Sequence, residues 1–177
     1  GTNWDLSRLA DKQHLQHLVD TNQPYLVTGG PPCTAFSQMR RISDFKRDPA
    51  VVDQERREGA SHVNFAFRIY RKQVQAGRYF LHEHPAGATS WQLPCVKAAE
   101  KWPNVQKVTM DMCRMGLTTT GPDGVERPAR NRTTWMTNSP ILAKALSILC
   151  NCTQPHAHLE SGRPKFAQVY PIRLITT

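Results

Sequence analysis

Short apolar runs alternate along the chain with segments of helical periodicity, and this alternation restricts the fold more than any other feature. Leu and Val recur at helical spacing over residues 7–21, just before the apolar run 24–28. A second helical segment over 60–76 precedes the apolar run 79–81. The remaining expected elements are helices over 91–101 and 140–149 and strands over 105–110 and 133–137. Strands separated by helices predict an α/β domain with a mostly parallel sheet and flanking helices.

The chain length of 177 residues fits one compact domain. We expect an α/β core over residues 1–138 and, in the same domain, a C-terminal helix with a small Cys/His segment over 139–177. No stretch approaches the roughly 18 apolar residues of a spanning helix, and the N-terminus lacks the pattern of a secretory signal. These features predict an intracellular protein without a membrane partner.

Positive charge is concentrated in one part of the chain. The net charge is +9, and residues 38–78 hold ten Lys and Arg residues against five Asp and Glu residues. A localised positive charge favours a polyanionic partner such as nucleic acid. The alternative is a solvated surface segment whose acids lie among its bases.

A cysteine follows the first expected strand in a rigid setting. Cys33 comes directly after Gly29–Pro32, and this loop can hold a thiol out of the core as a nucleophile. The alternative is a small apolar side chain buried in a turn. Ligands of α/β sheets gather beyond the carboxyl ends of the strands, so Cys33 and Glu83, which ends the next strand, are expected at one rim.

The segment Gly29–Ser37 reads GGPPCTAFS and resembles the catalytic loop of the DNA cytosine-5 methyltransferases, G-G-P-P-C-x-x-F-S. The resemblance implies that the Cys33 thiolate adds to C6 of a flipped-out cytosine, whose C5 then takes a methyl group from S-adenosylmethionine. Glu83 matches the family's glutamate that contacts N3 of the base. His84 and Pro85 stand where the family has Asn and Val.

Further matches follow in the family's order. Arg130 and Arg132 resemble the family's Arg-x-Arg pair at a strand start and would position the substrate, although Pro128 replaces the usual Gln. For S-adenosylmethionine, the resemblance implies Asp5 near the adenine and Pro31 in the binding site.

The family's glycine-rich cofactor motif, Phe-x-Gly-x-Gly, is absent from the sequence. The expected fold is therefore a partial Rossmann-like, methyltransferase-like sheet. Three explanations stay open: a fragment that lacks an N-terminal half, a domain completed by a partner chain, or a relic that no longer binds the cofactor. The wider pattern, from Pro-Pro-Cys to Cys-x-x-x-His-x-His, resembles methyltransferase-like segments of retrotransposon polyproteins of protists and fungi.

Other residues are candidates for binding the substrate. The family's mobile loop meets the DNA backbone just after the catalytic cysteine, where this chain has Ser37, Arg40 and Arg41. His82 and His84 alternate with Glu83 and are expected to line the cleft or contact phosphate, with metal binding as the alternative.

Soft metal ligands cluster near the C-terminus. Cys150, Cys152, His156 and His158 lie within nine residues and suit Zn²⁺, with Cys113 as a replacement for Cys150. The alternative is a polar loop without a metal.

These features together predict a cytosine-5 methyltransferase-like domain that acts on DNA in the nucleus, with RNA as an open alternative. A second hypothesis is a non-catalytic nucleic-acid-binding module of a mobile-element polyprotein. A third, a thiol hydrolase, requires His82 or His84 beside Cys33.

Overall fold

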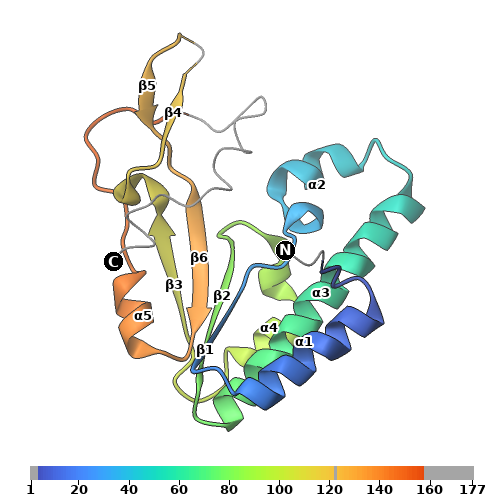
Figure 1. Ribbon diagram of the computed structural model, residues 1–177. Coiled ribbons are helices and arrows are strands. Elements are labelled where there is room, and N and C mark those ends of the chain that lie inside the picture. Colours follow the sequence, from blue (N-terminus) through green and yellow to red (C-terminus); the bar gives the residue numbers. More distant parts are fainter. Residues whose placement is uncertain (1–3, 122, 158–177) are drawn as a thin grey trace.

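The computed structural model describes residues 4–121 and 123–157 (Figure 1). The helices are α1 (Leu9–Asn22), α2 (Gln38–Asp44), α3 (Pro49–Gln75), α4 (Pro94–Ala99) and α5 (Pro140–Ala145). The strands are β1 (Leu26–Gly29), β2 (Tyr79–Pro85), β3 (Gln106–Asp111), β4 (Thr118–Thr120), β5 (Glu126–Pro128) and β6 (Arg132–Thr137). Short 3₁₀ helices are η1 (Thr34–Phe36), η2 (Thr89–Gln92) and η3 (Met112–Met115). The chain is thus a mixed α/β protein, and none of its described helices is long and apolar enough to cross a membrane.

The main sheet has the strand order β1-β2-β6-β3 and contains one parallel pair, β1 with β2. Strand β6 runs antiparallel to both of its neighbours, which corrects the expectation of a mostly parallel sheet. The connection from β1 to β2 contains the long helix α3, which carries the chain back for a parallel pairing. The connection from β3 to β6 contains the β4–β5 hairpin and no α-helix among its described residues, and the chain returns antiparallel.

Helix α3 is longer than the sequence periodicity predicts. Its start is set by Asp48, whose side chain accepts a hydrogen bond from Ala50 N, and by Pro49 in the first turn. The first part of the helix has too few apolar residues to show a 3.6-residue pattern. Instead, charged side chains of this part form ion pairs with charged side chains of α2. These pairs exist only in the folded chain.

The two faces of the sheet are covered by different helices (Figure 1). Phe80 and Met136 point to the face packed by α3 and α4, where they form the larger core. Leu81 and Trp135 point to the other face, where they pack with Leu142 of α5. Because side chains alternate along β2, one strand contributes to the core on one face and places Glu83 on the other.

Gly29, at the end of β1, is required by a close approach of α3. A Cβ at this position would overlap the hydroxyl oxygen of Tyr70, and the next nearest atom is the ring Cζ at 3.3 Å. We expect Gly29→Ala to lower the free energy of unfolding by about 1–3 kcal/mol, as overpacking does. Urea denaturation of Gly29→Ala, Tyr70→Phe and the double variant checks this. The double variant should be less destabilised than the sum of the single variants, because phenylalanine removes the overlapping oxygen; additive losses would contradict this explanation.

Candidate functional site

The cysteine loop leaves the end of β1 and turns at once into η1. Cys33 is half-buried, and its carbonyl accepts a hydrogen bond from Phe36 N at 2.9 Å. Phe36 is buried against Gly59 of α3, where an added Cβ would lie 2.9 Å from the ring. Phe36 therefore packs in the core and anchors the cysteine loop to α3.

Glu83 lies beside the cysteine loop. Strands β1 and β2 are parallel neighbours, so their carboxyl ends meet at one edge of the sheet. A Cβ at Gly30 would lie 3.2 Å from Glu83 Oε2, which places the carboxylate against the loop. The structure thus brings Cys33 and Glu83 to one rim.

Burial and, to a smaller extent, the negative charge of Glu83 raise the pKa of Cys33 above its ordinary value. Cys33 is therefore a protonated thiol at neutral pH, and a nucleophilic attack requires that its proton first be removed. The nearby carboxylate is a group that could accept this proton.

The influence of Glu83 on the thiol can be measured directly. We expect Glu83→Gln to lower the pKa of Cys33, because the variant removes a negative charge that disfavours the thiolate. The pH profile of Cys33 alkylation by iodoacetamide, followed by peptide mass spectrometry, should shift to lower pH in the variant. Cys95, whose pKa is raised by burial, serves as the internal control and should not shift. An unchanged Cys33 profile would contradict the proximity of the two groups.

His82 and His84 are buried on the opposite face of β2 from Glu83, at 1% and 0% exposure. This burial corrects the expectation that they line the cleft or contact phosphate, since almost no surface of either side chain is exposed. The Nε2–H of His84 donates to the carbonyl of Pro31 at 2.8 Å, and its Nδ1 accepts from the Ser90 hydroxyl at 2.5 Å. Burial lowers the pKa of both histidines, so they are neutral. His84 therefore fixes the cysteine loop to β2.

The hydrolase hypothesis requires a histidine that activates Cys33. In residues 4–121 and 123–157, no histidine forms a hydrogen bond with this thiol, and His84 uses both ring nitrogens for other partners. The described geometry therefore gives this hypothesis no support.

A mostly apolar cavity of about 530 Å³ lies beside β1 and the cysteine loop. Both residues expected to bind the cofactor line it, Asp5 from the segment before α1 and Pro31 from the loop. One oxygen of Asp5 accepts hydrogen bonds from Ser7 N and Ser7 Oγ at 2.9 and 2.7 Å. Asp5 thus stabilises the turn before α1 and also contributes a carboxylate to the cavity wall.

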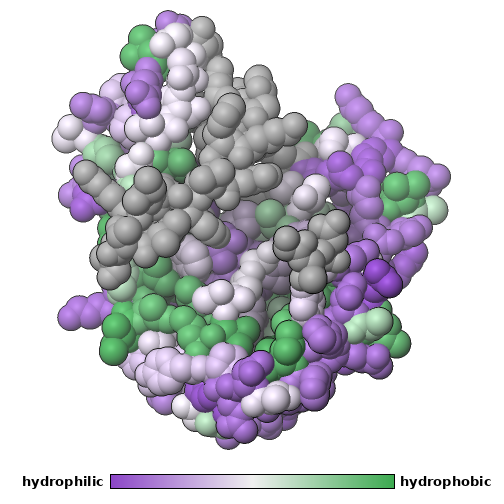
Figure 2. Space-filling model, viewed as in Figure 1, coloured by the Kyte–Doolittle hydropathy of each residue, from purple (hydrophilic) through white to green (hydrophobic). Residues whose placement is uncertain are grey.

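The residues that follow the cysteine loop have structural partners. Ser37 caps α2, since its hydroxyl accepts a hydrogen bond from Arg40 N. Arg40 and Arg47 both bind Glu55, at 2.6 and 2.7 Å, which lowers the pKa of Glu55 to about 2. Arg41 lies in α2, and its side chain is outside the described part of the structure. Hydrophilic residues predominate over α2 and the start of α3 (Figure 2), where part of the positive charge is neutralised by internal ion pairs.

Arg132 is held by a carboxylate that the sequence analysis missed. Asp111, fully buried at the end of β3, accepts from Arg132 Nε at 2.8 Å and Arg132 Nη2 at 3.0 Å. These bonds lower the pKa of Asp111. Asp111 could have been predicted from the sequence, because it is an acid at the carboxyl end of an expected strand. Arg130 is exposed and makes no ion pair with a described carboxylate.

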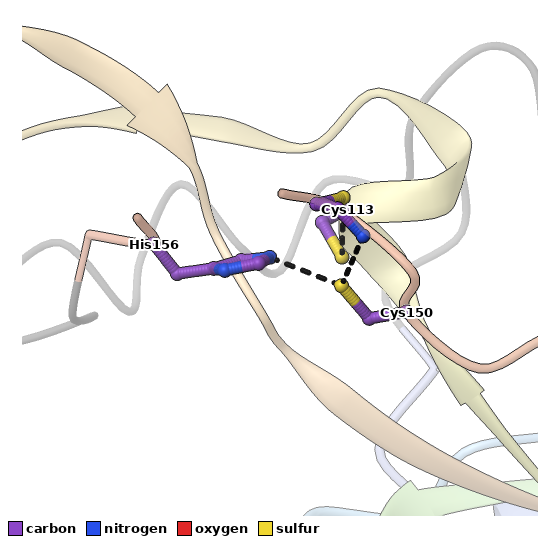
Figure 3. Close-up of side chains that lie close together, drawn as sticks. Cys113, Cys150 and His156 are labelled. Atoms are coloured by element: carbon purple, nitrogen blue, oxygen red, sulfur yellow. Dashed lines mark hydrogen bonds between the residues drawn. The ribbon is translucent and has the colours of Figure 1, made fainter. Parts of the chain in front are cut away.

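Three cysteines and one histidine converge just beyond the end of β3, and Figure 3 labels Cys113, Cys150 and His156 among them. One ligand atom from each of Cys113, Cys150, Cys152 and His156 lies within 4.8 Å of the others, so the four residues form a group that could hold a metal ion. The Sγ of Cys150 lies 3.3 Å from His156 Nε2, and the Sγ atoms of Cys113 and Cys152 are 4.0 Å apart. Cys113 therefore joins Cys150 rather than replacing it, and His158 lies outside the described residues.

The thiols of this group differ in acidity. Burial raises the pKa of Cys113 to about 12, whereas a hydrogen bond from the backbone N–H of Cys152 lowers the pKa of Cys150. The group thus combines a thiol whose pKa is lowered with one whose pKa is raised, and a bound cation would favour the thiolate of both.

Comparisons with protein-family models, curated protein sequences and solved structures gave no match to this chain. A proposal about function therefore depends on the motif in residues 29–37 and on the geometry around it.

Proposed function

We propose that this chain is a cytosine-5 methyltransferase-like domain, with Cys33 as the nucleophile and Glu83 as the group that assists at N3 of the base. The observation that supports the proposal most strongly is the convergence of these two residues at the ends of adjacent parallel strands. They are 50 positions apart in the sequence, and each matches a separate motif of the family that the sequence resembles.

The chemistry follows from the protonation state of the site. Addition forms a bond between Cys33 Sγ and C6 of cytosine, and the C5–C6 π pair is delocalised toward N3. The thiol proton must leave and N3 must gain one, so a carboxylate beside both atoms balances the reaction by accepting the first proton and donating it to N3. Support for this role of Glu83 comes from its carboxylate lying against the cysteine loop and from its charge, which raises the pKa of Cys33. A base inside a duplex must first be unstacked, which costs a few kcal/mol.

S-adenosylmethionine, when bound, would supply the electrophilic methyl group for C5. The support for this part of the proposal is the mostly apolar cavity of about 530 Å³ beside β1, whose lining includes Asp5, Gly29, Gly30 and Pro31. The proposal thus assigns Asp5 and Pro31 to binding this cofactor, and Arg130 and Arg132 to positioning the nucleic acid.

DNA is the partner that we propose, which would place the protein in the nucleus. Support comes from the net charge of +9 and from Arg57 and Arg71 of α3, which make no ion pair with any described carboxylate. These guanidinium groups are available to phosphates, unlike those of Arg40 and Arg47.

The second candidate function is a nucleic-acid-binding module without catalysis. The raised pKa of Cys33 favours it, because a resting thiol is a poor nucleophile. Covalent capture of a base distinguishes the two functions.

We also propose that the metal-binding group holds Zn²⁺. Three sulfurs and one imidazole nitrogen are a usual ligand set of structural zinc, whose sites are four-coordinate and closed.

The test uses DNA in which 2-pyrimidinone replaces one cytosine. This base lacks the C4 amino group and accepts a thiolate at C6 more readily, without needing a methyl donor. The proposed function predicts a covalent complex in intact-mass spectra that maps to Cys33. DNA that binds without forming a complex would indicate the binding module, and the same base in single-stranded RNA tests RNA as the substrate.

A further inference from the structure

The metal-binding group and Arg132 are connected through one buried carboxylate. Besides the two bonds from Arg132, Asp111 Oδ2 accepts a hydrogen bond from the backbone N–H of Cys150 at 2.9 Å. Cys150 therefore has two roles, since its Sγ belongs to the metal-binding group and its N–H holds Asp111. The ligands and the arginine are thus joined by a chain of direct contacts.

The segment that carries three of the four ligands has little structure of its own. Residues 150–156 contain no helix or strand, and the segment is attached at its ends by Asp111 N to Ile148 O and by Ala157 N to Pro128 O. A metal ion would join this segment to Cys113 in η3 and fix its path across the end of β3. Without the ion, the segment loses this cross-link to Cys113.

Asp111 binds only one side of the Arg132 guanidinium group. Asp111 binds Nε and Nη2, whereas Nη1 takes part in neither bond, and 49% of the side chain is exposed. Arg130 lies two residues earlier, and its positive charge acts on both Asp111 and Cys150. Two guanidinium groups therefore lie beside the metal-binding group, one of them oriented by a buried acid. This arrangement suits a phosphate group.

We infer that the metal ion organises an anion site for a nucleic-acid phosphate, in which Asp111 is the residue that positions Arg132. The inference rests on the proposed zinc site. The ion itself does not touch the phosphate. It orders residues 150–156, whose Cys150 N–H fixes the carboxylate that orients the guanidinium.

The test combines zinc content with DNA affinity as a function of salt. Protein purified without chelator should contain one zinc per chain, and Arg132→Ala should keep it. This variant should bind duplex DNA about tenfold more weakly, with a salt slope smaller by about one, as expected for a lost phosphate contact. Arg127→Ala is the matched control, since Arg127 pairs with Asp123 within the β4–β5 hairpin and not with Asp111, and it should change neither readout.

Metal loss should have the same effect as loss of Arg132. Cys152→Ser should lose zinc and bind DNA about tenfold more weakly, and adding Arg132→Ala should cause no further loss. Asp111→Asn should keep zinc yet show the smaller salt slope. Chelation of the wild type followed by zinc addition gives the same comparison if Cys152→Ser does not fold. Cys95→Ser should retain zinc and full affinity.

Different results overturn different claims. A chain without zinc, or a disulfide between Cys113 and Cys152 seen as a loss of two hydrogens, would overturn the zinc proposal. Zinc-free protein that binds DNA with wild-type affinity and salt slope would overturn the coupling to Arg132 alone. Neither result depends on covalent capture at Cys33, which tests the methyltransferase-like function separately.

Discussion

Cys33→Ser should abolish covalent capture of 2-pyrimidinone DNA while DNA affinity stays unchanged. A serine hydroxyl has nearly the same size as the thiol but ionises far less readily, so the addition to C6 loses its nucleophile. We expect the rate of complex formation to fall at least 1,000-fold, on the order seen when a covalent nucleophile is removed. The loop should keep its shape, because it is held by the backbone bond from Phe36 N and by His84 on Pro31.

A matched control is available for this variant. Cys95 is also a half-buried free cysteine with a pKa raised by burial, and it lies on α4 rather than in the loop. Cys95→Ser should form the complex at the wild-type rate. A complex that survives Cys33→Ser would show that another thiol attacks the base, and the proposed role of Cys33 would be wrong.

Of the proposed variants, Phe80→Ala should lower the free energy of unfolding the most. Phe80 has no exposed surface, stacks on Tyr70 at 4.8 Å between ring centroids and contacts the Trp102 ring edge-on. Removing a fully buried phenylalanine ring costs about 3–5 kcal/mol, because it loses apolar burial and leaves a cavity. At roughly 2–4 °C per kcal/mol for a domain of this size, the melting temperature should fall by about 10 °C.

Circular dichroism during heating and urea titration would measure this change. Ile141→Ala is the control, since Ile141 is 80% exposed on α5 and its loss should alter the unfolding free energy by less than about 0.5 kcal/mol. Equal effects of the two variants would contradict the placement of the core between the sheet and α3.

The sequence predicted the elements whose side chains repeat regularly. The strands β1, β2, β3 and β6 and the helices α1 and α5 occur where periodicity and Gly or Pro residues indicated them, with shifts at their ends. Residues 38–59 gave no such pattern, because their helices α2 and α3 are stabilised by caps and by ion pairs between them. The short hairpin of β4 and β5 has only three residues per strand, too few for an alternation to be recognised.

Strand direction was the main error about the fold. Alternating helices and strands are consistent with a parallel sheet, but pairing order is a property of the folded chain. Strand β6 lies antiparallel between β2 and β3. Nothing in the sequence of β6 predicts this position.

The sequence indicated some residues of the candidate site but not their contacts. The sequence pointed to Cys33 and Glu83, and to three of the four residues of the metal-binding group with Cys113 as a replacement. It did not show that Arg40 is bound to Glu55.

What the sequence determined by itself is the local chemistry. A rigid Gly-Gly-Pro-Pro turn before Cys33, a glutamate at the end of a strand and a run of soft ligands near the C-terminus follow from neighbouring residues alone. Only the tertiary structure decided which of these groups meet, which are buried and which find ionic partners. The physical reason is that burial, pKa and ion pairing depend on distances between segments far apart in the chain. Cys33 and Glu83, 50 residues apart, and Asp111 and Cys150, 39 residues apart, come together only when the sheet forms.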